Sequence, residues 1–159
     1  MKLHLLKEKK WNLFFTFNLL LLIVVIFTGC TSIKFVADYD EEIDRGITSF
    51  QKKMEFHLIK LERNIGKEDA RYESSIDFYD QIKVDLSALK VRAAALPQND
   101  ITLQQLDLII ENVNLLEKLH KLGISSNDIE PLRNAFNIST TAILKFELAK
   151  KRGIKNENK

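Results

Sequence analysis

Residues 40–65, DEEIDRGITSFQKKMEFHLIKLERNI, decide the fold of this chain. The apolar positions recur every three or four residues: Ile43, Ile47, Phe50, Met54, Leu58, Leu61 and Ile65. Six steps across 22 residues give a repeat close to 3.6, which is the period of a straight α-helix with one apolar face. Acidic residues at its start suit the positive end of the helix dipole, and Gly66 is a typical end signal. The stretch therefore predicts a long amphipathic helix.

Three further segments have the same periodicity and predict three more helices. Their predicted ranges are residues 68–96, 102–122 and 126–152. Pro97 ends the first of them, because a residue before proline disfavours helical geometry. Thr102 and Gln105 have the spacing of a capping box at the start of the next, and Gly123 predicts its end.

No stretch of the sequence predicts a β-strand, and the connections between the predicted helices are short. Short connections between long helices favour antiparallel neighbours. The sequence therefore predicts an all-α fold, an antiparallel up-down-up-down four-helix bundle over residues 39–152 with a polar tail at 153–159. A length of 159 residues suits one such domain.

The beginning of the chain has a different composition. Four lysines and one glutamate lie among the first ten residues, and residues 13–27 then contain no charge. A cationic flank followed by 7–15 apolar residues is typical of a secretory signal peptide. Fifteen helical residues span roughly 22 Å, which is short for a permanent membrane span.

The apolar run ends at Phe27-Thr28-Gly29-Cys30, with small residues directly before the only cysteine. This pattern resembles the lipobox of bacterial lipoprotein precursors. The resemblance implies that residues 1–29 form a signal peptide, that Gly29 is the last residue removed and that Cys30 carries a diacylglyceryl group and an acyl chain. Residues 30–38 would then hold the lipidated cysteine and a short tether, and Phe27 departs from the leucine usual at the first lipobox position.

An uncleaved signal anchor is the alternative interpretation of the same segment. With Trp11 and Gly29 included, the stretch of low charge reaches 19 residues, which is physically long enough to hold a chain in a bilayer. Both interpretations predict attachment to a membrane, with the rest of the chain outside the cytoplasm, facing the periplasm. Thr31 follows the cysteine where inner-membrane lipoproteins of enterobacteria have aspartate, so the resemblance favours the outer membrane if the organism has two.

The net charge of +2 depends on the predicted signal peptide. Its removal takes away four lysines and one glutamate, which leaves a formal charge of −1. The basic character is therefore no argument for nucleic-acid binding.

A basic group lies at the predicted end of the last helix: Lys150, Lys151, Arg152 and Lys155. If the first helix leaves the membrane, the fourth returns to it, and these residues are candidate contacts with lipid head groups. The alternative is that cations suit the carboxyl end of a helix, and the pattern favours that alternative.

Chemistry-bearing motifs are sparse. Glu117 and His120 form one of the two Glu-x-x-His motifs that a di-metal bundle needs, and the only other histidine after Cys30, His57, has Glu55 at a spacing that places the two on different sides of a helix. No phosphate-binding loop, dinucleotide motif or Gly-x-Ser-x-Gly motif is present in the sequence. The sequence thus predicts no catalytic residue, metal or cofactor.

Two local clusters have structural interpretations. The acidic residues of segment 38–44 lack the spacing of a Ca²⁺-binding loop and suit a helix amino terminus. Tyr72, Phe78 and Tyr79 are candidates for a ligand groove or partner face, although core packing is the favoured interpretation.

Segments 35–40 and 148–153 also resemble small proteobacterial lipoproteins of unknown role, which implies a helical lipoprotein of the cell envelope. The sequence therefore predicts a non-enzymatic, lipid-anchored protein that binds an envelope protein through its helix faces. The alternatives are a carrier or sensor of a small apolar ligand in the bundle core and an uncleaved, signal-anchored protein.

Overall fold

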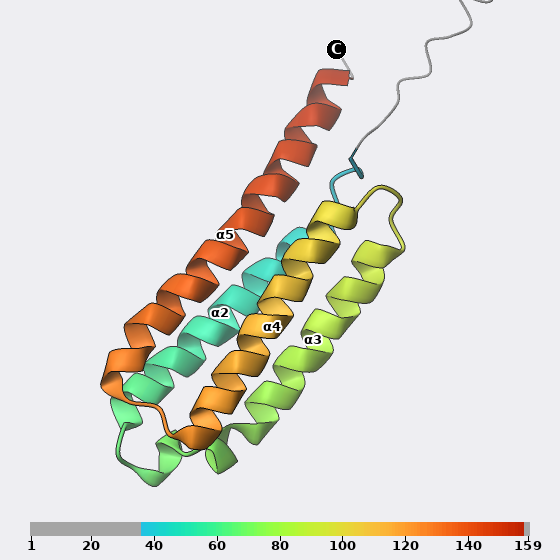
Figure 1. Cartoon of the computed structure of the whole chain (residues 1–159). Coiled ribbons are helices and arrows are strands. Elements are labelled where there is room, and N and C mark those ends of the chain that lie inside the picture. Colours follow the sequence, from blue (N-terminus) through green and yellow to red (C-terminus); the bar gives the residue numbers. More distant parts are fainter. Residues whose placement is uncertain (1–35, 158–159) are drawn as a thin grey trace, which may run out of the picture. The chain divides into compact units, whose positions relative to one another are not determined.

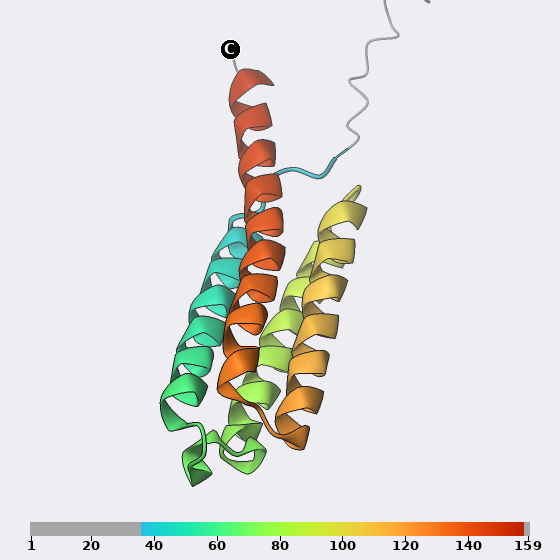
Figure 2. The same ribbon diagram turned by 60° about the vertical axis from the view of Figure 1, so that its left-hand side comes forward.

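The computed structural model describes residues 36–157, so the predicted signal peptide, Cys30 and most of the predicted tether lie outside the described residues. Four helices follow one another in the chain: α2 (Glu41–Asn64), α3 (Ile76–Ala94), α4 (Asp100–Leu122) and α5 (Ser126–Glu157). Two short 3₁₀ turns, η1 (Glu68–Ala70) and η2 (Tyr72–Ser75), connect α2 to α3. Helix α2 packs against α3 and α5, and α4 packs against the same two helices (Figures 1 and 2). The predicted all-α, antiparallel four-helix bundle is confirmed.

Helix α2 has the apolar face that its sequence predicts. Six of the seven residues of the predicted stripe, from Ile43 to Leu61, are at most 1% exposed. The seventh, Ile65, lies just past the helix end. Asp40 caps the amino end, where its Oδ1 accepts hydrogen bonds from the amides of Glu42 (2.9 Å) and Ile43 (3.0 Å).

Gly46 lies inside α2, directly against Leu89 of α3. A β-carbon there would overlap the methyl groups of Leu89. The absence of a side chain therefore allows α3 to approach α2, which offsets the roughly 1 kcal/mol that glycine costs in a helix.

The second predicted helix begins eight residues later than its periodicity indicates. Residues 68–75 form the two 3₁₀ turns instead. Arg71, between them, has an extended backbone (φ −78°, ψ 155°), which prevents a continuous helix. Two long-range hydrogen bonds hold these turns against α4: His120 donates to the Ala70 carbonyl, and the Tyr72 hydroxyl donates to Glu117.

Two further helix boundaries differ from the prediction. Helix α4 begins at Asp100, and Thr102 lies buried inside its first turn, where it hydrogen-bonds to Glu147 instead of capping the helix. Helix α5 begins at Ser126 as predicted but continues through Gly153 to Glu157, so the predicted polar tail is helical over most of its length. In both views the last turns of α5 extend past the ends of the other helices (Figures 1 and 2).

Candidate functional site

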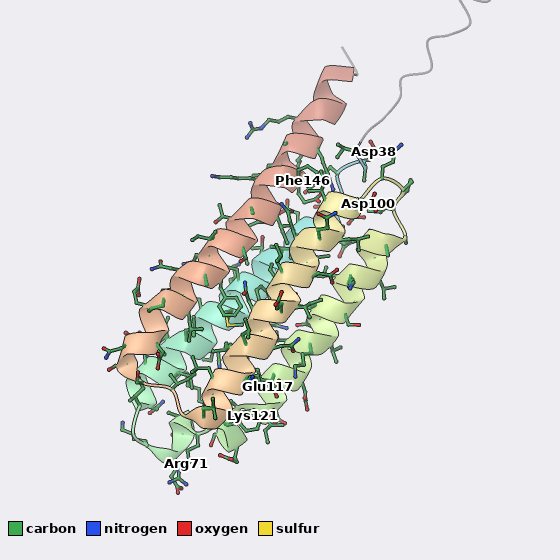
Figure 3. The ribbon with its side chains drawn as sticks, viewed as in Figure 1. Asp38, Arg71, Asp100, Glu117, Lys121 and Phe146 are labelled. Carbon is green, nitrogen blue, oxygen red and sulfur yellow. The ribbon has the colours of Figure 1, made fainter. Side chains whose placement is uncertain are left out.

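Three features of the bundle are candidates for function: a polar cluster at each end and an exposed apolar row along one side. The Asp40 end is the end at which residues 36–40, the α3–α4 connection and Lys150 meet. The His120 end is the opposite one, where the 3₁₀ turns and the α4–α5 connection meet. Figure 3 shows Asp38, Asp100 and Phe146 at the Asp40 end, and Arg71, Glu117 and Lys121 toward the His120 end.

A buried ion pair lies at the centre of the Asp40 end. The Nζ atom of Lys150 donates hydrogen bonds to Glu147 Oε1 (2.6 Å), Asn99 Oδ1 (2.8 Å) and Thr102 Oγ1 (3.0 Å). The side chains of Lys150 and Glu147 are only 2% and 0% exposed. Three bonds satisfy all three hydrogens of the ammonium group, which makes the burial of this charge tolerable.

The same cluster fixes the chain before α2. The Ala37 amide donates to the Gln98 carbonyl (3.0 Å), and the Arg92 guanidinium donates to both carboxylate oxygens of Asp40 (2.8 and 3.0 Å). Burial raises the pKa of Asp40, but the bonds from Arg92 and from the amides of α2 outweigh burial and lower it below its usual value. We call residues 37–40 with these partners the clamp. The acidic segment 38–44 thus begins a helix, as its composition indicates.

The basic residues predicted as lipid contacts divide into two groups. Lys150 is buried in its pair with Glu147, so its ammonium group is not accessible to lipid head groups, and its inclusion among them was wrong. Lys151 and Arg152 are exposed on the projecting end of α5, and Lys151 also lies over the ring of Tyr39, 4.7 Å from its centroid. The side chain of Lys155 lies outside the described part of the structure.

At the His120 end, the imidazole of His120 connects three elements. Its Nε2 lies 2.9 Å from the Ala70 carbonyl, and its Nδ1 lies 2.8 Å from the Tyr79 hydroxyl. A carbonyl can only accept, so Nε2 carries the proton and Nδ1 accepts from Tyr79. Burial raises the pKa of Tyr79, which keeps its hydroxyl protonated as the donor.

His57 lies beside this network and is 3% exposed. Its ring stacks on Phe78 with centroids 3.7 Å apart, and its centroid is 6.0 Å from that of His120. Within the described residues, its Nε2 has no hydrogen-bond partner. Burial, with smaller contributions from His120 and Lys60, lowers the pKa of His57 to about 3.

Glu117, the carboxylate of the lone Glu-x-x-His motif, is paired with cations of the protein itself. It forms ion pairs with Lys83 and with Lys121 (3.0 Å), and it accepts from Tyr72 (2.8 Å). The hydrogen bond from Lys83 is the main reason that its pKa falls to about 2. Among residues 36–157 no group of three or more metal-ligating side chains comes together.

The aromatic residues predicted as a groove or packing cluster pack inside the bundle. Tyr79 is 1% exposed, and Tyr72 and Phe78 are partly buried against the core. A cleft of about 410 Å³ lies elsewhere, between α2 and α3. Its lining includes Arg45, Lys53 and Asp85, and such a charged lining does not suit an apolar ligand.

An exposed apolar row runs along α4, and the sequence reasoning missed it. It consists of Ile101, Leu108, Leu115 and Leu122, which are 47%, 57%, 56% and 79% exposed. Their spacing of seven residues was the available signal. A larger set of apolar residues fills the core side of the same helix and masks this spacing.

Family models, curated proteins and solved structures provide no match for this chain. Within residues 36–157, no helix is both long and apolar enough to cross a bilayer. The function must therefore be inferred from the residues themselves.

Proposed function

We infer that this chain is a lipid-anchored protein of the cell envelope, without enzymatic activity, whose bundle presents helix faces to a protein partner. Acylation of Cys30 attaches it to the membrane, and the bundle faces the periplasm. The observation that carries this proposal is the clamp. It fixes the chain at Ala37, only seven residues after the cysteine at the end of the predicted signal peptide.

The short distance has a mechanical consequence. Seven fully extended residues reach about 25 Å at most, so an acylated Cys30 keeps the Asp40 end close to the lipid surface. Buried methylenes contribute about 0.8 kcal/mol each, and two or three acyl chains on one residue make attachment effectively stable.

The projecting end of α5 supports the same orientation. Lys151 and Arg152 are exposed at the Asp40 end, where the proposed tether leaves the bundle. Each cation near an anionic lipid surface contributes about 1 kcal/mol of attraction. We therefore propose that Lys151 and Arg152 contact lipid head groups, whereas Lys150 is excluded because its side chain is buried.

Charged and hydrogen-bonding groups at the two ends serve packing. Lys150 and Glu147 satisfy each other at one end, and His120 and Glu117 hold the 3₁₀ turns at the other. The feature left without a packing role is the apolar row on α4, which is the face that we assign to partner binding.

Mass spectrometry of the protein isolated from its native envelope tests the anchor directly. An amino terminus at Cys30 that carries acyl chains is expected. A protein that begins at Met1 would instead support the uncleaved signal anchor. The matched variant Cys30→Ser is expected to accumulate as an unprocessed precursor, and unchanged processing would contradict the proposal. Fractionation of the two membranes tests the preference for the outer one.

The lipid contact has a separate test. Full-length protein is reconstituted in vesicles with or without anionic lipid, and protection of the α5 end from protease is compared. Lys151→Glu with Arg152→Glu is expected to abolish the protection that anionic lipid gives, whereas Lys52→Glu, at an exposed position of α2, leaves it unchanged. Equal protection in all vesicles would mean that the cations only stabilise the helix end.

A further inference from the structure

The exposed row on α4 forms a continuous ridge that winds slowly around the helix. Seven residues correspond to two helical turns less about 20°, so its members lie about 10.5 Å apart along the axis. From Ile101 to Leu122 the ridge is about 32 Å long, nearly the whole length of α4. Other exposed apolar residues are isolated or form short groups, such as Phe56 on α2 and the pair Val84 and Val91 on α3.

Beside this ridge, α5 carries a row of small residues. Hydrogen bonds between Asn112 and Ser139 and between Thr102 and Glu147 show which residues of the two antiparallel helices lie at the same height. In that register, the ridge residues Ile101, Leu108 and Leu115 lie level with Ala149, Ala142 and Ala135, all three of them exposed. The face between α4 and α5 therefore has a row of large apolar side chains next to a row of small apolar side chains. We call it the α4/α5 face.

We propose that a second copy of this chain docks on the α4/α5 face, related by a two-fold axis parallel to the helices. Such an axis places α4 of one copy opposite α5 of the other. The leucine ridge of each copy then lies over the alanine row of its partner, and every contact occurs twice, as an isologous interface requires. The face is thus complementary to itself.

The proposed orientation rests on the proposed function in one respect. A two-fold axis parallel to the helices leaves the Asp40 ends of both copies at the same end of the dimer. Two copies anchored in one membrane satisfy this condition without bending their tethers. An antiparallel dimer would place one of the two clamps at the far end, beyond the roughly 25 Å reach of its tether.

Charges along the face agree with α4 opposite α5. Glu111 and Lys118 are both exposed on the outer side of α4. Direct pairing of α4 with α4 about the same axis would place Glu111 against Glu111 and Lys118 against Lys118, which is unfavourable.

The size of the face is adequate for a modest dimer. Two helices 8–10 Å apart present a strip about 20 Å wide, so a face 32 Å long covers roughly 600 Å² in each copy. A standard interface buries about 800 Å² per partner. The dimer is therefore expected to be weak in dilute solution and to depend on the high local concentration of a membrane surface.

Disulfide crosslinking in the native membrane tests the geometry. Two full-length chains with different tags are co-expressed, one with Leu115→Cys and the other with Ala135→Cys. A disulfide dimer that contains both tags is expected, and Leu115→Cys paired with itself is expected to give at least tenfold less. Phe56→Cys and Val91→Cys, which replace residues 72% and 71% exposed on other faces, are the matched controls.

Each outcome has a defined meaning. Dimer formation at the control positions equal to that at the α4/α5 face, or none at the face, overturns the proposal, as does a crosslink only to a different protein. The unsubstituted chain reports separately on the anchor, because an acylated Cys30 cannot form a disulfide. If the unsubstituted chain does crosslink, the lipid anchor fails, and the same comparison is repeated with Cys30→Ser in every chain.

A second measurement does not depend on new cysteines. Leu108→Glu with Leu115→Glu is expected to reduce lysine-reactive crosslinking of the membrane-bound chain at least tenfold. Val84→Glu with Val91→Glu, at residues of similar exposure on α3, is expected to leave it unchanged. Thermal melting, monitored by circular dichroism, is the check that both variants remain folded. Unreduced crosslinking in a folded Leu108→Glu/Leu115→Glu variant would overturn the proposal.

Discussion

Mild acid is expected to destabilise the bundle through His57. A histidine in an unfolded chain has a pKa near 6.5, whereas burial lowers the pKa of His57 to about 3 in the folded protein. Between these values the unfolded state binds a proton that the folded state does not bind. The stabilisation is therefore complete above pH 6.5 and is lost as the pH falls toward 3. At pH 5 the loss amounts to about 2 kcal/mol.

The surroundings of His57 explain why the folded state resists protonation. Phe78 and Tyr79 from α3 and His120 from α4 pack around its ring, and the charge of Lys60, on the same helix as His57, adds to the effect. No carboxylate in the described residues pairs with its Nε2. A proton on His57 would therefore be buried beside an apolar ring and near another imidazole.

Urea unfolding of the full-length protein in detergent, at pH 7.5 and pH 5, measures the effect. The variant His57→Phe keeps an aromatic ring to stack on Phe78 and leaves nothing to titrate. Every other titratable group is the same in the two proteins, so the difference between them isolates His57. The unsubstituted protein is expected to lose about 2 kcal/mol more than the variant between the two pH values. Equal losses would refute the reasoning.

Three other substitutions have defined outcomes. Lys150→Met leaves Glu147 buried without its cation and is expected to reduce the free energy of unfolding by about 3–5 kcal/mol, while additional Glu147→Leu restores most of the loss; urea titration of both variants measures this. Gly46→Ala forces a methyl group into Leu89 and is expected to cost about 1–3 kcal/mol, which a second change, Leu89→Ala, relieves in part by removing the clash; a double-mutant cycle that finds no coupling would contradict this. The pKa of Glu117 lies at about 2 instead of 4.5, so its contribution to stability is present above pH 4.5 and is lost toward pH 2. Between pH 7.5 and pH 3 the unsubstituted protein is expected to lose about 2 kcal/mol more of its free energy of unfolding than Glu117→Gln does, as measured by urea unfolding.

The sequence predicted the helices well where burial alone decides the structure. The 3.6-residue period from Ile43 to Leu61 arises because one side of the helix faces the core. The spacing of apolar residues within the segment is enough to predict this. Residues 68–75 were mispredicted because bonds to α4, from His120 and Glu117, decide their conformation. Those partners lie some 45–50 residues away, and no local pattern specifies them.

The charged clusters were harder to predict than the helices. Lys150 lies in a basic segment of the sequence, which predicts an exposed cation. Lys150 follows Ile143 and Glu147 at helical spacing, so it lies on the same buried side of α5. This helical position could have indicated its burial. A charge at a buried phase indicates a buried pair, since lysine is almost never fully buried without a partner.

The two apolar rows of α4 explain why a bundle helix can serve both its own core and a second protein. The buried positions of α4 recur every seven residues, as Thr102, Ile109 and Leu116 do, and α3 and α5 cover them. The exposed row repeats every seven residues and drifts by about 20° around the helix at each repeat. A neighbour remains in contact with a drifting row only if its axis is inclined by about 20°, the angle at which neighbouring helices in bundles pack. The row on α4 thus has the geometry of a helix–helix seam, and α5 of a second copy, inclined in this way and lined by alanines, matches it along nearly its entire length.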